Sequence, residues 1–499
     1  MLAGPGTGKT HILSARIGHI LRATDTQANN ILCLTYTDAG ANAMRKRLLQ
    51  FIGPESHKVH IFTFHSFCNQ IVKENLSLFG LQDLEIATEL ERIEIIRELI
   101  DELPTGHTLK NNRYMPYLHE RKLLKLFDLM KSENWTVEGL HQAIGQHLED
   151  IMTHPDYRYK RKHREFKKGD LKLGEIRKIE KQMETLHEAA RLFPKYLIGL
   201  RKRQRYDFAD MLRWVRDAFD QYPDLLRRYQ EQYLYFLIDE FQDTNGIQLE
   251  VLEQLIGFWK NPNVFAVGDD DQSIFEFQGA RIKNVKDFYD KFEQHIKVVV
   301  LTENYRSVQD ILDAAKILID HNELRLIRQL GQLDLEKTLR SANPGFSKLN
   351  VKPELLQYPQ RLQEELSIVE RIEQLRQEGQ ELHEIAVLFA KHRQSATLIR
   401  LLDRKGIPYQ TKKRVNILKL PVIRNVITLF EYLDKELQFP YSGEELLFKL
   451  LHFPFWEIKA IDLAKLSLWR AKNWQSARAI DEYKSPETCL NLIQNQELL

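Results

Sequence analysis

A glycine-rich segment near the start of the chain, AGPGTGKT at residues 3–10, has the residue types and spacing of a loop that binds phosphate. It follows the pattern G-x-x-x-x-G-K-[ST], with alanine in place of the first glycine. The glycines let the backbone curl so that its N–H groups face a phosphate, and Lys9 would neutralise the β- and γ-phosphates of a nucleotide. Thr10 would ligate Mg²⁺ through its hydroxyl. A chance glycine-rich turn is the alternative. The predicted nucleotide-binding residues are Ala3, Gly4, Pro5, Gly6, Thr7, Gly8, Lys9 and Thr10.

Two carboxylates follow an apolar segment in FLIDEFQDTN, residues 236–245. Asp239 stands at the end of the expected strand and can hold Mg²⁺ through water. Glu240 is placed to polarise an attacking water, which is the role of a general base. The structural alternative is a strand end followed by an Asp/Asn helix cap. That alternative weakens because the same chain carries a phosphate loop.

Two further apolar segments end in polar groups. VGDDDQSIF (267–275) carries Gln272, which is neutral and could contact either the γ-phosphate or the attacking water. LTENYRS (301–307) carries Tyr305, which can stack on a base, and Arg306, which can pair bidentately with phosphate. Because parallel strands end at the same edge of a sheet, these groups fit one site at that edge.

The elements that would position these groups alternate between helix and strand. Residues 9–21 and 39–51 predict helices, and another helix is expected from Ser66. Short apolar segments with β-branched residues predict buried strands. The alternation indicates a parallel sheet with helices on both faces. The expected strands are 31–37, 59–64, 233–240, 263–269 and 296–302.

Only Met1, Leu2 and Ala3 precede the phosphate loop. A strand normally aims such a loop at its ligand, and three residues are too few to supply one. We therefore expect that the chain begins too late, through truncation or a misplaced start.

The alternation disappears between about residues 83 and 229, where long polar segments and the amphipathic run 88–103 predict a mostly helical insertion. A second α/β stretch covers residues 350–410, with 385–390 (IAVLFA) as its clearest expected strand. From residue 420 onward the pattern is helical again.

The composition is that of a globular protein of several domains. The chain has 499 residues, of which 43% are hydrophobic and 28% charged. Its net charge of +2 excludes a polycation, so any nucleic-acid surface must be a local patch. No segment approaches the ~20 apolar residues that cross a bilayer, and we expect no membrane partner. The three cysteines show no paired spacing, which fits a reducing cytoplasm.

Six segments, in one order along residues 3–307, resemble helicase motifs I, Ia, Ib, II, III and IV of the UvrD/Rep/PcrA group of superfamily 1. They are AGPGTGKT, LTYTDAGANAMRKRL, TFHSF, LIDEFQDTN, VGDDDQSIFEFQGA and LTENYRS. Residues 385–409 also look like the second motor domain of that group.

The resemblance implies an α/β fold of RecA-like P-loop NTPase sheets with large helical insertions. Residues 1–82 and 206–285 would form the first RecA-like domain (1A), with 83–205 inserted in it (1B). Residues 286–420 would start the second RecA-like domain (2A), and 421–499 its helical insertion (2B), truncated. The activity implied is ATP-driven, Mg²⁺-dependent translocation 3′ to 5′ on single-stranded DNA, acting at single-strand/duplex junctions in repair or recombination. A nuclease domain or subunit would be a possible partner.

The resemblance also assigns roles. Lys9 and Thr10 would bind phosphate and Mg²⁺. Asp239 would bind Mg²⁺, and Glu240 would act on the attacking water. Gln272 would sense the γ-phosphate, Tyr305 would stack on the adenine, and Arg306 would contact the γ-phosphate. Aromatic faces stack on any base for roughly 1–3 kcal/mol each. Core packing is the alternative for each of them. The candidate DNA contacts are Tyr36, Phe64, His65, Phe275 and Phe277.

Motifs V and VI of the group, with the arginine that reaches the γ-phosphate, are not found before residue 499. The chain is therefore expected to be a fragment with little or no unwinding activity of its own. Two other functions stay open: a non-catalytic DNA-binding subunit of a helicase–nuclease complex, and an RNA-directed motor, since stacking and phosphate contacts do not report the 2′-OH.

Two basic segments, 157–168 and 201–206, allow two interpretations. One is that they bind the phosphates of duplex DNA, in which case the binding affinity would depend steeply on salt concentration. The other is a solvated helix surface balanced by nearby acids.

Overall fold

The computed structural model describes residues 1–79, 84–110, 115–161, 167–273, 282–323, 325–329, 335–345, 349, 351–411, 416–439 and 442–478. It divides into two compact units, residues 1–354 and 355–499. Among the described helices, none combines the length and apolarity needed to span a bilayer.

A parallel sheet in the first unit has the strand order β3-β2-β6-β7. Its register pairs Cys33 with Ile61 on one side and with Leu237 on the other. The α/β class with parallel strands, predicted from the sequence, is confirmed. The strands are β1 (Leu2–Ala3), β2 (Ile31–Thr35), β3 (His60–Thr63), β4 (Glu85–Ile86), β5 (Arg205–Tyr206), β6 (Tyr235–Ile238), β7 (Asn263–Ala266), β8 (Val300–Leu301), β9 (Glu303–Asn304) and β10 (Arg340–Ser341).

Helices cover both faces of this sheet, because successive strand residues point to opposite sides. On β2, Leu32 and Leu34 pack with residues of α3, α10 and α12, while Ile31 and Cys33 pack with α1 and α2. All four side chains are buried. The helices outside the insertion are α1 (Lys9–Ala23), α2 (Asp38–Ile52), α3 (Phe64–Glu74), α4 (Leu76–Phe79), α10 (Phe208–Gln221), α11 (Pro223–Gln232), α12 (Gly246–Ile256), α13 (Ile282–Phe292), α14 (Gln309–Ile319) and α15 (Leu326–Gln329).

The prediction that three residues cannot supply a strand ahead of the phosphate loop was wrong. Leu2 pairs in parallel with Val300 of β8 and forms a bridge to Gly268. The Ala3 N–H donates to the Gly268 carbonyl over 2.9 Å. Two residues suffice here because neighbours on both sides satisfy their backbone groups.

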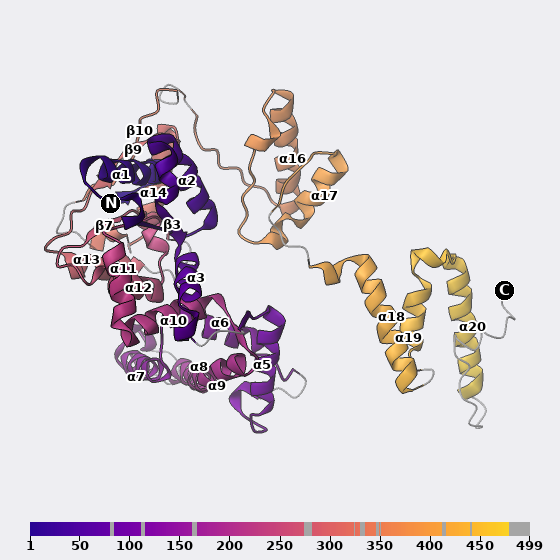
Figure 1. The fold of residues 1–499 in the computed structure, drawn as a ribbon. Helices are drawn as coiled ribbons and strands as arrows, with labels where there is room; N and C mark the ends of the chain where they lie inside the picture. Colours follow the sequence, from indigo (N-terminus) through magenta and orange to yellow (C-terminus); the bar gives the residue numbers. More distant parts are fainter. Residues whose placement is uncertain are drawn as a thin grey trace. The chain divides into compact units, whose positions relative to one another are not determined.

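The predicted insertion is helical and has a core of its own, in which the rings of Phe127 and Tyr196 lie 4.9 Å apart. Its two ends meet, since β4 pairs in parallel with β5. Buried Lys131 links it to α10 through ion pairs of 2.7 Å to Asp207 and 2.8 Å to Asp210. The helices lie together in Figure 1: α5 (Glu89–Asp101), α6 (Glu120–Ser132), α7 (Val137–Thr153), α8 (Leu173–Arg191) and α9 (Phe193–Lys202).

The expected strand 296–302 is shorter than predicted. Only Val300–Leu301 form β8, and β9 then pairs in parallel with β10. This second pairing holds the Tyr305–Arg306 segment against residues 340–341, far along the chain.

The second unit contains helices where the sequence predicts them, but not the strand expected at 385–390. No strand is described in that segment, and Leu388 is 92% exposed. A strand needs a hydrogen-bonding neighbour, and none is described within this unit. Its helices are α16 (Arg361–Gln377), α17 (Ala396–Lys405), α18 (Pro421–Gln438), α19 (Glu444–Leu451) and α20 (Ala460–Arg478).

Candidate functional site

The glycine-rich loop between β1 and α1 is shaped to receive an anion. Gly6 and Gly8 have φ angles of 77° and 88°, a region that residues with a side chain rarely adopt. Helix α1 has no acidic residue in its first turn and no side-chain cap at Gly8. The N–H groups of its first turn therefore keep their hydrogen-bonding capacity, and the helix dipole favours negative charge at this end.

Lys9 lies directly against the carboxylate that follows β6. Its Nζ is 2.8 Å from Glu240 Oε2, although 231 residues separate the two along the chain. The loop and the acidic pair thus meet at one edge of the sheet, as the parallel topology requires.

Glu240 has a backbone conformation that is uncommon for a residue with a side chain, φ 49° and ψ 47°. Its N–H donates to Asp239 Oδ1 over 3.0 Å, and its Oε2 accepts a 3.0 Å hydrogen bond from Gln242 Nε2. Such conformations persist where the surroundings enforce them, often at functional sites. Here the result is a carboxylate turned toward Lys9.

The acidic cluster after β6 carries more negative charge than its surroundings neutralise. Burial, and then the charge of Glu240, raise the pKa of Asp239 and of Asp243 to about 6. Asp243 Oδ1 is buried without a hydrogen-bond partner among the described residues. Raised pKa values and an unsatisfied carboxylate oxygen are what a divalent cation would relieve, so these residues fit Mg²⁺.

The LTENYRS segment closes over the phosphate loop. Buried Asn304 donates from Nδ2 to the Pro5 carbonyl over 2.5 Å, and the Tyr305 N–H donates to the Gly6 carbonyl over 2.9 Å. A Cβ on Gly6 would lie 2.7 Å from Cβ of Arg306, so only glycine fits this contact. The side chain of Tyr305 is half-exposed, and Arg306 has no ion-pair partner among the described residues.

An open pocket of about 680 Å³ lies where these segments meet. It brings together most of the residues predicted for the nucleotide, the water and the γ-phosphate. It also includes Arg47 and Asn343, which the sequence did not single out. Arg47 stands in a run of three basic residues on α2, which reads as an ordinary helix surface. The pocket is lined by Pro5, Gly6, Gly8, Lys9, Thr10, Arg47, Glu240, Gln272, Tyr305, Arg306 and Asn343.

Four predicted residues lie behind this lining. Ala3 is buried in the sheet, and Gly4 accepts a 2.8 Å hydrogen bond from the hydroxyl of buried Thr7. Asp239 is buried beside Glu240 and accepts its N–H. These residues support the loop and the carboxylate.

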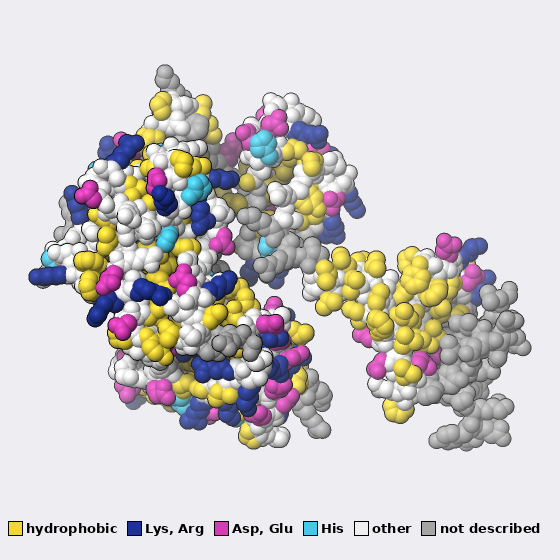
Figure 2. Space-filling view, in the orientation of Figure 1, with side chains coloured by type: hydrophobic (Ala, Val, Ile, Leu, Met, Phe, Trp, Pro, Cys, Tyr) yellow, Lys and Arg dark blue, Asp and Glu magenta, His cyan; other side chains and the backbone are white. Residues whose placement is uncertain are grey.

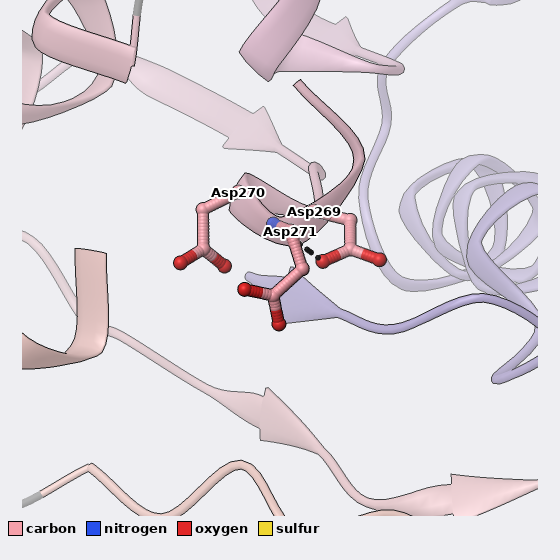
Figure 3. A group of neighbouring side chains, drawn as sticks. All are labelled: Asp269, Asp270 and Asp271. Carbon is pink, nitrogen blue, oxygen red and sulfur yellow. Dashed lines mark hydrogen bonds between the residues drawn. The ribbon is translucent and has the colours of Figure 1, made fainter. Parts of the chain in front are cut away.

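Three consecutive aspartates, Asp269, Asp270 and Asp271, lie in the turn that follows β7 (Figure 3). Their carboxylates are close enough together to hold a cation. Buried Lys337 fills that position. Its Nζ lies 2.5, 2.6 and 2.9 Å from the three carboxylates in turn. Arg325 pairs with Asp271 through two contacts of 2.8 and 2.9 Å. Each aspartate after β7 is therefore already paired with at least one of the chain's own two cations.

The candidate DNA contacts separate into different environments. Phe64 is 3% exposed and packs in the core with α10 and α12, so its predicted stacking role has to be corrected to core packing. His65 is partly buried near the ring of Phe208, with its pKa lowered mainly by burial. Tyr36 is partly exposed at the end of β2. Phe275 and Phe277 lie outside the described residues.

The basic segment 201–206 is largely balanced by acids. Arg203 contacts Glu94 and Glu98 of α5 at 3.1 and 2.5 Å, and Arg205 contacts Glu91 at 2.7 Å. Figure 2 shows basic and acidic side chains interspersed over the insertion. The solvated-surface interpretation therefore describes Arg203 and Arg205. Of segment 157–168, residues 162–166 lie outside the described residues.

Comparison with known families gives two matches that follow each other along the chain. The UvrD/REP helicase N-terminal domain matches residues 1–293, and the UvrD-like helicase C-terminal domain matches residues 299–461. The expectation that motifs V and VI are absent is not borne out, because the chain spans both domains of this family.

Curated relatives are similar over most of the chain. ATP-dependent DNA helicase PcrA of Staphylococcus epidermidis is 26% identical over 413 residues, covering 82% of this chain and 48% of the relative. PcrA of Bacillus subtilis is 26% identical over 411 residues, covering 82% and 47%. ATP-dependent DNA helicase UvrD1 of Mycobacterium tuberculosis is 26% identical over 441 residues, covering 87% and 50%. The chain spans about half the length of the curated relatives it matches.

Proposed function

The chain belongs to the UvrD/REP helicase family, and from that premise we propose that it binds and hydrolyses ATP and acts as a DNA helicase or translocase. The observation that carries the proposal is the 2.8 Å contact between Lys9 and Glu240 inside a pocket that also holds Gln272 and Arg306. A phosphate-binding lysine, a carboxylate for the attacking water and a phosphate-binding arginine are the parts that ATP hydrolysis requires.

Each residue has a proposed role that follows from its position. The N–H groups at the start of α1 and Lys9 hold the β- and γ-phosphates, and Tyr305 offers its half-exposed ring to the adenine. Glu240 orients and deprotonates the attacking water, and Arg306 meets charge that develops on the γ-phosphate. Mg²⁺, held by Thr10 and through water by Asp239, would supply further charge neutralisation on the phosphates.

Without nucleotide, Lys9 is paired with the Glu240 carboxylate. Nucleotide binding must therefore exchange Glu240 for phosphate as the partner of Lys9. Polyphosphate is the more highly charged anion and draws the ammonium away. Glu240 is then released to accept a proton from water, while Gln242 keeps its 3.0 Å contact. The ion pair thus keeps both side chains at the phosphate site until a nucleotide arrives.

The proposed track is single-stranded DNA, followed 3′ to 5′, as the family resemblance implies. Tyr36 directly follows β2, and His65 lies in the first turn of α3, which directly follows β3, so both stand at the carboxyl ends of the strands. Stacking on such side chains is independent of base sequence, which suits a motor. We propose the domain boundaries given in the sequence analysis for this arrangement, with repair or recombination as the process served.

The test replaces the carboxylate without changing its shape. Glu240→Gln should reduce oligo(dT)-stimulated ATP hydrolysis by about 10²-fold or more, a typical contribution of general-base catalysis. The binding of a fluorescent ATP analogue should remain. Glu89→Gln, on the exposed start of α5, is the matched control and should hydrolyse ATP normally.

Two outcomes would redirect the proposal. If the wild-type chain binds the analogue but shows no hydrolysis with DNA, the non-catalytic DNA-binding subunit becomes the better account. If oligo(U) stimulates hydrolysis more than oligo(dT), the motor is directed to RNA.

A further inference from the structure

Lys337 is a buried cation with no place in the proposed chemistry. Its side chain is 2% exposed, and its Nζ contacts Asp269 at 2.5 Å and Asp270 at 2.6 Å. Burying an ammonium is costly unless anions surround it, and here the surrounding charges raise the pKa of Lys337 despite its burial. The lysine therefore stays charged and holds the turn after β7 in one conformation.

Asp269 is the part of this cluster that reaches the nucleotide pocket. Its Oδ1 faces Lys337, while its Oδ2 accepts a 2.5 Å hydrogen bond from Gln272 Nε2. A carboxylate only accepts, so this bond fixes the amide of Gln272 with its nitrogen toward Asp269. Gln272 lines the pocket beside Lys9 and Glu240.

Asp269 also reaches the catalytic carboxylate by a second route. Its backbone N–H donates to Gln242 Oε1 over 2.9 Å, and Gln242 Nε2 donates to Glu240 Oε2 over 3.0 Å. Both Gln242 and Asp269 are buried. A displacement of Asp269 would thus move two residues that face the γ-phosphate position.

We propose that Lys337 is a positioning residue for γ-phosphate recognition, which acts on Gln272 through Asp269. This inference rests on the proposed function. Lys337 lies shortly before β10, which pairs with β9 next to Tyr305 and Arg306. The segment 337–341 therefore supports both groups that are proposed to contact the γ-phosphate, the neutral Gln272 and the cationic Arg306.

The spacing of the three aspartates would otherwise suggest a metal site. Lys337 lies within 2.9 Å of each of them, and Arg325 takes up both oxygens of Asp271. The Leu326 N–H donates to Asp270 Oδ2 over 2.8 Å. The carboxylates thus have a complete set of partners from the chain, and the cluster serves as a brace.

The test measures how well the protein distinguishes a nucleotide with a γ-phosphate from one without it. Mant-ATPγS and mant-ADP are titrated with Mg²⁺ into the full chain, and the ratio of their dissociation constants is compared. Lys337→Met should lower the preference for mant-ATPγS about 10-fold, the scale of one hydrogen bond to a charged group, with mant-ADP binding unchanged. Lys316→Met, on the exposed surface of α14, is the control and should leave the ratio unchanged.

A double-mutant cycle separates positioning from general damage. If Lys337 acts through Gln272, Lys337→Met should cause no further loss in a Gln272→Ala background. Additive losses, or an unchanged ratio in the single variant, would overturn the inference. If Lys337→Met does not fold, Asp269→Asn decides the matter, because its amide would face the Gln272 amide and should produce the same loss. An unchanged ratio in folded Asp269→Asn would also overturn it.

Failure of the proposed function gives a different result. A wild-type chain that binds neither mant-nucleotide contradicts the nucleotide site itself. A wild-type chain that binds both, with variants that behave like wild type, contradicts only the role of Lys337.

Discussion

Two acidic clusters follow neighbouring strands of the same sheet, and their electrostatics are opposite. After β6, Asp239 and Asp243 have pKa values raised to about 6, with Lys9 as the nearby cation. After β7, salt bridges lower the pKa of Asp271 in spite of its burial. There Lys337 and Arg325 form ion pairs with the three aspartates from within the chain.

The difference separates a site prepared for a ligand from a structural brace. A cluster that keeps excess negative charge pays a folding cost that a divalent cation and a nucleotide can reverse on binding. A cluster whose carboxylates are already paired with cations of the chain gains less from such a ligand. In both clusters the carboxylates follow directly after a strand, so the cations that pair with them, and not the strand-end position of the acids, distinguish the two clusters.

The largest expected effect on stability comes from removing Lys337, the cation that holds the cluster after β7. Lys337→Met should lower the free energy of unfolding by about 3–5 kcal/mol, because it leaves buried carboxylates without their cation. Urea unfolding of this variant beside Lys316→Met measures the loss. A change below about 1 kcal/mol, the range of exposed pairs, would mean that the cluster after β7 is not held by Lys337.

A smaller effect of opposite sign is expected in the other cluster. Asp243 has an ordinary pKa of 3.8 and a folded value of about 6. The folded state binds this proton more tightly, so stability falls as pH rises from about 4 to about 6 and stays lower above that. Asp243→Asn should therefore raise the free energy of unfolding by up to about 3 kcal/mol at pH 7.5.

The same variant should come close to wild type near pH 3.5, where the carboxyl is mostly protonated in both states. Urea unfolding at the two pH values in the absence of Mg²⁺ measures this. A stabilisation that is equal at both pH values would show that the charge of Asp243 is not its cause.

The smallest effect is expected at Lys9. Lys9→Met should change the free energy of unfolding by about 1 kcal/mol or less, since Glu240 is 35% exposed and water can replace the lysine. The loss of unfolding free energy should therefore be much smaller for Lys9→Met than for Lys337→Met. A loss at Lys9 as large as that at Lys337 would make both lysines structural.

The sequence predicted most of the residues that line the pocket because they belong to short local patterns. The glycine-rich loop needs positive φ angles, the acids follow an apolar strand, and parallel topology brings such strand ends to one edge. Phe64 could not be assigned in this way. It lies in a motif that carries DNA contacts in the family, but the burial of its side chain depends on helices that pack against it from elsewhere in the chain. The local sequence does not indicate that packing.

The supporting residues could not be predicted because they act from distant positions. Asn304 and Lys337 lie about 300 residues or more from the loop in sequence. Asn304 belongs to the LTENYRS segment, but that pattern does not indicate its contact with Pro5, and Lys337 belongs to none of the predicted motifs. Strand β1 was missed because two residues carry no periodicity; its neighbours on both sides define it. The segment 385–390 is the reverse case: it is apolar, but the described part of its unit contains no strand with which it could pair.

The most direct test of the account is nucleotide binding by Lys9→Ala. Mant-ATPγS titrated with Mg²⁺ into wild type and variant should show a loss of affinity of about 10²-fold, because a charged contact to the phosphates worth about 3 kcal/mol is removed. Mant fluorescence or calorimetry gives the dissociation constants. Equal affinity in the two proteins would contradict the assignment of the pocket around Lys9 and Glu240 as the nucleotide site.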